Sequence, residues 1–155
     1  MGEELRCWAE ISLDRIAANY RSMHAAVGEA VEVLCVVKAN AYGHGMIEVS
    51  RRLLGEGVRW LGVTSVEEGV ELRRAGIEAP VLVMADALHG SFADMLEYKL
   101  TPAVHDIADL ARLNALASSR GERVPVHVKV DTGMGRLGCS TTSEEAVSYT
   151  HLRAH

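Results

Sequence analysis

The sequence predicts an α/β fold with parallel strands, and more closely an incomplete TIM-type (β/α) barrel with about five of the eight βα units of a closed barrel. Three observations support this prediction. Apolar, strand-like runs alternate with helical patterns five times along the 155 residues. The runs are almost continuously apolar, as in parallel strands that are covered on both faces. The chain is also short, because a closed barrel typically needs about 250 residues.

Apolar runs that end at turn-forming residues predict the strands. The chain opens with a short strand-like segment at 7–11. The five strands of the barrel are predicted at 31–37, 60–64, 81–85, 101–105 and 124–131. No linker or low-complexity tract interrupts them, so residues 1–146 are predicted to form one partial barrel domain.

Capping residues predict where helices begin between these strands. Ser12 and Asp106 are N-cap residues, and Ser65 with Glu68 forms a capping box. A second capping box, beginning at Thr142, predicts one more helix start. With their caps, the predicted helices are 12–27, 46–54, 65–76, 92–98 and 106–119. The last residues, 147–155, lack the apolar period of these helices and look like a translated sequencing adapter, so we predict a non-native or disordered tail.

Composition excludes several classes of function. The net charge of −5 and the lack of a Lys/Arg block argue against nucleic acid and acidic membranes as partners. The sequence shows no apolar stretch of spanning length and no signal peptide, which favours a cytoplasmic location. The three cysteines share no close spacing, and the histidines of the barrel region lack ligand spacing, so we predict no metal site and no disulfide framework.

One lysine stands where parallel α/β folds place their chemistry. Lys38 follows the apolar run 31–37 and precedes a turn-forming, glycine-bearing segment. It is therefore predicted at the carboxyl end of a strand, on the face shared by Leu34 and Val36. A partly desolvated lysine amine can condense with an aldehyde to form a Schiff base. The alternative is a lysine that simply reaches into water from the end of a strand.

The fifth strand carries a second group of charged residues. In strand alternation His127, Lys129 and Asp131 share one face, predicted to be the barrel interior, while the intervening valines face the helices. Asp131 is a candidate ion-pair partner for Lys129 or Arg136, because buried charges need partners. Arg136 lies in a glycine-rich loop, and a fixed guanidinium suits a phenolate or carboxylate. The loop also spells G-x-G-x-x-G, so a dinucleotide site is an alternative, although no strand follows to carry the expected acidic residue.

Two segments together give the chain a family resemblance. They are Val37-Lys38-Ala39-Asn40-Ala41-Tyr42-Gly43-His44-Gly45 and Lys129-Val130-Asp131-Thr132-Gly133-Met134-Gly135-Arg136-Leu137-Gly138. In order and spacing they resemble alanine racemase, and the similarity extends from Trp8 to about Gly138. It covers nearly all of this chain but less than half of a whole racemase.

The resemblance implies an enzyme that interconverts L-alanine and D-alanine with pyridoxal 5'-phosphate as cofactor. Lys38 would hold the cofactor and act as one of two catalytic bases. Tyr42 would contact the cofactor phosphate. Arg136 would bond the cofactor's phenolic oxygen and help to place the substrate carboxylate. Lys129 matches a lysine that is often carbamylated in the family, where a carbamate would be an anionic partner for Arg136.

The family works as a homodimer and takes its second base, a tyrosine, from a β domain of the other subunit. This sequence has no counterpart of that tyrosine, so we predict that the chain as written does not racemise alanine. Three alternatives remain open. They are a non-catalytic barrel protein that binds pyridoxal phosphate, a racemase or decarboxylase of another amino acid on the same fold, and a nucleotide-binding α/β domain.

Overall fold

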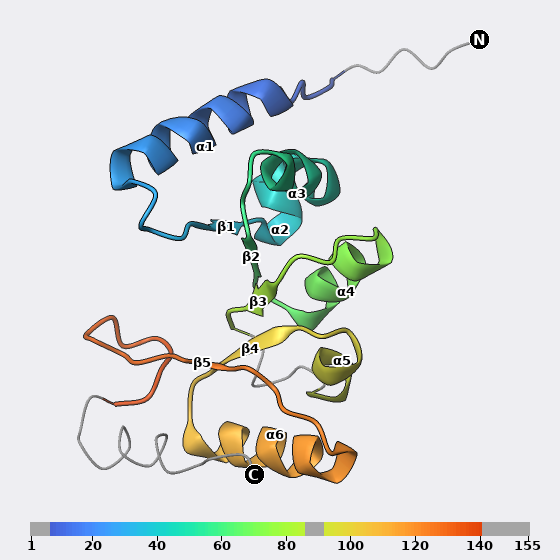
Figure 1. The fold of residues 1–155 in the computed structure, drawn as a ribbon, viewed down its shortest axis with the longest axis vertical. Helices are drawn as coiled ribbons and strands as arrows, with labels where there is room; N and C mark the ends of the chain where they lie inside the picture. The colour runs from blue at the N-terminus through green and yellow to red at the C-terminus, as the bar shows by residue number, and fades with distance from the viewer. Residues whose placement is uncertain (1–6, 86–91, 141–155) are drawn as a thin grey trace.

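The computed structural model describes residues 7–85 and 92–140, and five parallel strands form one sheet in them (Figure 1). The strands pair in sequence order, β1-β2-β3-β4-β5. Their bounds are β1 Leu34–Val36, β2 Trp60–Val63, β3 Val81–Val83, β4 Thr101–Val104 and β5 His127–Val128. Each strand is therefore joined to its neighbour by a crossover connection, as in a singly wound barrel.

Helices connect the strands. Figure 1 shows α3, α4 and α5 standing along the same side of the sheet, with α1 packed beside α3. The bounds are α1 Leu13–Val27, α2 Lys38–Gly43, α3 Met46–Gly55, α4 Val66–Arg74, α5 Phe92–Glu97 and α6 Ile107–Arg120. In a doubly wound fold the strand order reverses at one point and helices cover both faces. The uninterrupted order seen here favours the partial barrel that the sequence predicts.

Side chains alternate between the two faces of the sheet. Leu61 and Val63 on β2, and Val81 and Val83 on β3, have no exposed surface and lie in the core shared with the helices. The other face is tighter around Gly62. A Cβ at Gly62 would lie 2.7 Å from Leu34 Cδ2 and within 3.5 Å of atoms of Val36 and Met84. A bare glycine at position 62 therefore leaves room for the side chains of β1 on this inner face.

The sheet is curled toward this inner face. The Trp60 ring, at the start of β2, lies 5.5 Å from the ring of His127 on β5. Strands β3 and β4 lie between them, and neighbouring strands are about 4.8 Å apart. A flat sheet would hold these two rings much farther apart, so the contact reports the curvature of a barrel wall. It also places His127 on the inner face, as predicted.

Helix starts were the most accurate of the sequence predictions. The Ser12 side chain accepts a hydrogen bond from Arg15 N–H, and the Asp106 carboxylate accepts one from Asp109 N–H. Ser65 and Glu68 form both halves of the predicted capping box. Since a cap satisfies amides within one turn of chain, these bonds depend on local sequence.

Three strand predictions need correction. No strand forms at 7–11, where the backbone is irregular. The strands predicted at 31–37 and 124–131 shorten to Leu34–Val36 and His127–Val128. Both are edge strands in the described residues, so each has a single neighbouring strand. Each is a strand only over the residues that pair with that neighbour. The predicted helix start at Thr142 and the tail at 147–155 lie outside the described residues.

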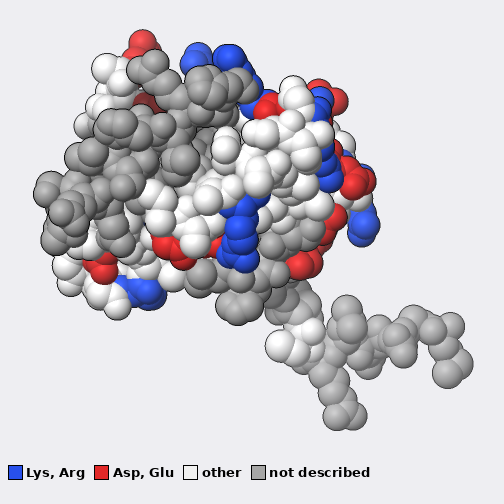
Figure 2. All heavy atoms as spheres, turned by 90° about the horizontal axis from the view of Figure 1, so that it is seen from below, with Lys and Arg blue, Asp and Glu red and all other residues white. Residues whose placement is uncertain are grey.

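Charges of both signs are interspersed on the surface. Figure 2 shows lysine and arginine side chains among acidic ones on the face seen from below. The chain as a whole carries a formal charge of −5. Among the described helices, none combines the length and apolarity needed to cross a membrane.

Candidate active site

Lys38 lies at the carboxyl end of β1, directly after the buried Val37. Its side chain is half-buried. The Nζ atom lies 5.9 Å from the centre of the Tyr42 ring, and Tyr42 is 61% exposed. An amine and a phenol therefore stand together at the rim of the sheet, open to a ligand that approaches from solvent.

The backbone that joins these two residues is left-handed, a conformation that L-amino acids disfavour. From Ala39 to Tyr42, four residues in succession have φ between 50° and 55°. Each such residue costs about 1–2 kcal/mol when it is not glycine. The turn brings Tyr42 back over Lys38, because in a helix of either hand residue i+4 lies near residue i. The small and glycine residues of this segment predict a turn, but not a left-handed one.

Hydrogen bonds at both ends hold this left-handed turn. Ala41 N–H donates to Val37 O at 2.8 Å, and Gly45 N–H donates to Asn40 O at 3.0 Å. The Asn40 side-chain oxygen accepts from Met46 N–H, at the start of α3, at 2.8 Å. His44 Nδ1 lies 2.8 Å from Ala41 O, which gives this histidine a structural role in the turn.

A carboxylate from the next βα unit also reaches the turn. Glu68 Oε1 accepts a hydrogen bond from Ala39 N–H at 2.6 Å. Glu68 was predicted only as part of a capping box, and nothing in the local sequence indicates a bond to a residue 29 positions away. The parallel pairing of β1 with β2 places the two loops side by side.

Lys129 follows β5 at the same edge of the sheet. Its N–H donates to Val104 O at 3.0 Å, and its side chain is half-buried. His105, which follows β4, is only 5% exposed, and within the described residues its ring interacts with the Met84 backbone without a well-formed hydrogen bond at either nitrogen. Burial first, and then the charge of Lys129, lower the pKa of His105. The rim beside Lys129 therefore holds an imidazole with unused hydrogen-bonding capacity.

The glycine-rich loop is closed upon itself. Cys139 N–H donates to Lys129 O and Asp131 N–H donates to Cys139 O, both at 2.9 Å. Asp131 Oδ1 accepts from the N–H groups of Gly133 and Gly135 at 2.9 and 3.1 Å. These bonds lower the pKa of the Asp131 carboxyl. Because the loop amides serve its own aspartate, they are not free to bind a phosphate as a dinucleotide loop would.

Arg136 lies exposed in this loop and forms no ion pair within the described part of the chain. The candidate pairing with Asp131 is replaced by the bonds of Asp131 to the loop backbone. The structure thus brings Lys38 and Tyr42 into contact, and it places Lys129 and the base of the Arg136 loop at the same edge of the sheet. Within residues 7–85 and 92–140, no ion pair joins the two groups.

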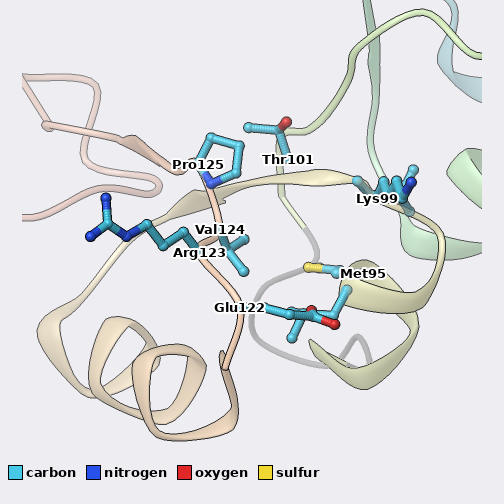
Figure 3. Close-up of a pocket in the computed structure, with 9 residues that line it drawn as sticks. Met95, Lys99, Thr101, Glu122, Arg123, Val124 and Pro125 are labelled. Carbon is cyan, nitrogen blue, oxygen red and sulfur yellow. The ribbon is translucent and has the colours of Figure 1, made fainter. Parts of the chain in front are cut away.

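A cavity of about 340 Å³ lies between α1, β1 and α3, and Ala41 and His44 of the turn after β1 are among its lining residues. Two other cavities lie at the opposite end of the strands. One of about 390 Å³ is bounded by Leu100, Thr101 and Pro125, where β4 and β5 begin (Figure 3). Another, of about 710 Å³, includes Arg73. The Arg73 guanidinium is already bonded to the carbonyl oxygens of Tyr98, Ile77, Ala79 and Lys99. Since chemistry in such folds sits at the carboxyl ends of the strands, we assign the site to Lys38 rather than to these cavities.

Comparison with known proteins points to one family. The family model for the alanine racemase N-terminal domain matches residues 11–155. Alanine racemase from Desulforamulus reducens is 41% identical over 95% of this chain and 40% of its own length. That from Symbiobacterium thermophilum is 44% identical over 84% of this chain and 34% of its own. The chain thus spans between 34% and 40% of these curated relatives.

Solved structures agree with the sequence relatives. Alanine racemase from Clostridium difficile, in complex with cycloserine, superposes with a TM-score of 0.87 at 35% identity. The alignment covers 96% of this chain and 41% of that one. The enzyme from Streptomyces coelicolor gives a TM-score of 0.83 at 29% identity, covering 93% of this chain and 39% of that one.

Proposed function

The chain belongs to the alanine racemase family, and we propose that it carries the cofactor lysine of an enzyme that interconverts L-alanine and D-alanine with pyridoxal 5'-phosphate. The observation that supports this most is the position of Lys38. It is a half-buried amine at the carboxyl end of a barrel strand, on a strained turn that also presents a tyrosine. Strain of this kind persists where the surrounding structure enforces it, and it gathers at functional sites.

The residues present fit this cofactor. Lys38 supplies a primary amine for the aldehyde carbon, and Tyr42 supplies an exposed phenol for the phosphate. Arg136 supplies a guanidinium for the phenolic oxygen and for the substrate carboxylate. Beside Lys129, the ring nitrogens of the buried His105 have no well-formed hydrogen bond among the described residues, so the imidazole could donate to one more acceptor group. A carbamate on Lys129 is such a group, and it would give Arg136 an anionic partner.

The chemistry divides between cofactor and protein. Pyridoxal phosphate, when bound, withdraws electrons from the substrate and makes its α-proton acidic. Lys38 would hold the cofactor through Nζ and, once the substrate amine has displaced it, would move a proton between the freed Nζ and one face of the α-carbon. Arg136 orients the carboxylate of the substrate. A second base is needed on the other face, and we propose that it comes from a tyrosine of a partner subunit in a homodimer.

The same proposal gives the protein a place in the cell. We propose a cytoplasmic enzyme that provides D-alanine for cell-wall precursors. Because this chain spans about two fifths of its first curated relative, we expect no racemisation by the 155-residue chain alone. An assay coupled to D-amino-acid oxidase measures this, and turnover by the purified chain would contradict it.

Cofactor binding can be tested on the chain itself, which has three lysines, Lys38, Lys99 and Lys129. After incubation with pyridoxal phosphate and reduction with borohydride, we expect the adduct on the peptide that contains Lys38. Lys38→Arg should abolish this adduct because a guanidinium does not condense with the aldehyde under these conditions. Lys99→Arg is the matched control and should leave it in place. An adduct spread equally over the lysines, or absent, would count against the proposal.

A further inference from the structure

The carboxylate of Glu68 divides its two oxygens between two loops. Oε2 accepts hydrogen bonds from Thr64 N–H at 2.8 Å and from Ser65 N–H at 3.3 Å, within its own βα loop. Oε1 accepts from Ala39 N–H at 2.6 Å, in the loop that follows β1. One side chain therefore ties together the carboxyl ends of two neighbouring strands.

An ordinary capping box does not require the second contact. In such a box the glutamate reaches back to the backbone of its own helix start, and Oε2 already does this. The bond from Oε1 is an additional, charge-assisted one, which is shorter and stronger than a bond between neutral groups.

The amide that donates this bond belongs to the residue next to Lys38. Ala39 directly follows Lys38 and is the first of the left-handed residues, with φ of 50°. Later amides of the turn find backbone acceptors, as Ala41 does at Val37 O. The acceptor found for the Ala39 amide is the Glu68 side chain. The orientation of the Lys38–Ala39 peptide thus depends on a residue of another βα unit.

We propose that Glu68 is a positioning residue for Lys38. By holding the Ala39 amide it fixes the peptide from which the Lys38 side chain leaves the backbone, and so keeps the amine at the rim in one orientation. This inference rests on the proposed function of Lys38 as the cofactor-binding amine. Glu68 acts through the backbone and has no contact with Lys38 Nζ among the interactions observed.

Three variants separate this role from the role of a helix cap. In Glu68→Gln one of the two acceptor oxygens becomes a donor, so the side chain can serve the capping box or Ala39 but not both. Glutamine is accepted in a capping box, and we therefore expect this variant to fold. Glu68→Asp keeps the charge and both oxygens but loses reach. Glu67→Gln is the matched control, because it removes a charge that bonds to the Ser65 cap in the same first turn of α4, without touching Ala39.

The first measurement is amide hydrogen exchange of Ala39 in the chain without cofactor. Exchange at Ala39 should be faster by about tenfold or more in both Glu68 variants, since a bond to a charged acceptor is lost. It should stay unchanged in Glu67→Gln. Equal exchange at Ala39 in the wild type and both Glu68 variants would overturn the proposal. If Glu68→Gln fails to fold, Glu68→Asp carries the same comparison.

The second measurement is the rate at which borohydride traps pyridoxal phosphate on Lys38. It should fall in the Glu68 variants and not in Glu67→Gln. Faster exchange with an unchanged trapping rate would overturn the positioning role, because it would leave Glu68 a purely structural residue. If the wild-type chain takes up no cofactor, the proposed function is what fails. Exchange at Ala39 then still decides the Glu68 contact, with faster exchange supporting it and equal exchange overturning it.

Discussion

The turn after β1 and the loop after β5 carry candidate site residues at the same edge of the sheet, yet they are held in opposite ways. The turn that bears Lys38 is strained, and bonds from α3 and from Glu68 hold it in place. The loop that bears Arg136 is held by its own ladder at Cys139 and by its own aspartate. One position is therefore imposed by the fold, and the other is built locally.

This difference indicates how the Lys38 turn and the Arg136 loop each acquire their geometry. The fold of the described residues already orients Lys38, because its turn is bonded to two other elements. The same residues fix the internal shape of the Arg136 loop but give the guanidinium no partner outside it. The lysine is thus pre-organised, whereas the direction of the arginine is left to whatever binds it.

The largest expected loss of stability comes from adding a Cβ at Gly138. This glycine has φ of 124°, and a Cβ there would lie 2.7 Å from Asp131 N and 3.0 Å from Lys129 O. Gly138→Ala should therefore open the base of the loop at a cost of about 2–3 kcal/mol. Because the loop is self-contained, faster amide exchange should appear at Asp131 and Cys139 while the rest of the chain keeps its protection.

A control for this substitution exists in the same chain. Gly121 ends α6 with φ of 66°, and an added Cβ there would meet nothing within 4 Å. Gly121→Ala should therefore cost only about 1 kcal/mol, the usual penalty of the left-handed conformation. A loss of protection that spread from Gly138→Ala to β1 and α3 would show that the loop is not independent of the fold.

The next effect tests the opposite claim for the turn after β1. Asn40→Ala removes the side-chain oxygen that accepts Met46 N–H, and it places alanine where asparagine tolerates the left-handed conformation better. We expect the free energy of unfolding to fall by about 1–2 kcal/mol. Since the turn is tied to α3, this loss should appear in global unfolding by urea.

Asn114, in the middle of α6, provides the comparison. Asn114→Ala should be neutral or slightly stabilising, because alanine is the better helix former. If Asn40→Ala changed only local amide exchange and left the urea transition in place, the turn would be as self-contained as the glycine loop, and the contrast between the two regions would disappear.

The sequence predicted well those features that depend on interactions within a few residues. The helix starts at Ser12, Ser65 and Asp106 follow from caps that act over one turn, and the parallel order of the strands follows from the alternation of βα units. Strand lengths at the sheet edges were overestimated. An apolar run shows that a segment can pair, but the neighbouring strand determines how much of it does.

The members of the candidate site are predictions from the sequence, whereas their geometry could not be predicted from it. Lys38 and Arg136 could be recognised from their segments. The left-handed stretch from Ala39 to Tyr42 contains no glycine, so the sequence does not indicate its conformation. Tertiary bonds impose that conformation, among them the one from Glu68. Asp131, the candidate partner of Lys129 or Arg136, forms no ion pair among the described residues, because its carboxylate accepts hydrogen bonds from its own loop amides. The charge of Lys129 contributes less than these bonds to the lowered pKa of the Asp131 carboxyl.

The smallest expected effect is also the most specific, because Ala→Gly should stabilise the protein at position 39, whereas it destabilises an ordinary helix. Ala39→Gly should relieve about 1–2 kcal/mol of left-handed strain. It should lose about 0.4–1 kcal/mol through the greater freedom of the unfolded chain. The net expectation is a gain of about 0.5–1 kcal/mol in the free energy of unfolding, measured by urea. The Glu68 contact should survive, because it uses the backbone N–H of residue 39.

The same exchange in a right-handed helix gives the opposite result. Ala115 is exposed within α6, and Ala115→Gly should cost about 1 kcal/mol. Stabilisation at position 39 together with destabilisation at 115 would demonstrate the left-handed turn in solution. If both substitutions destabilised equally, the backbone of residue 39 would be right-handed in solution. The strained turn that orients Lys38, and that the other lysines lack, would then be absent.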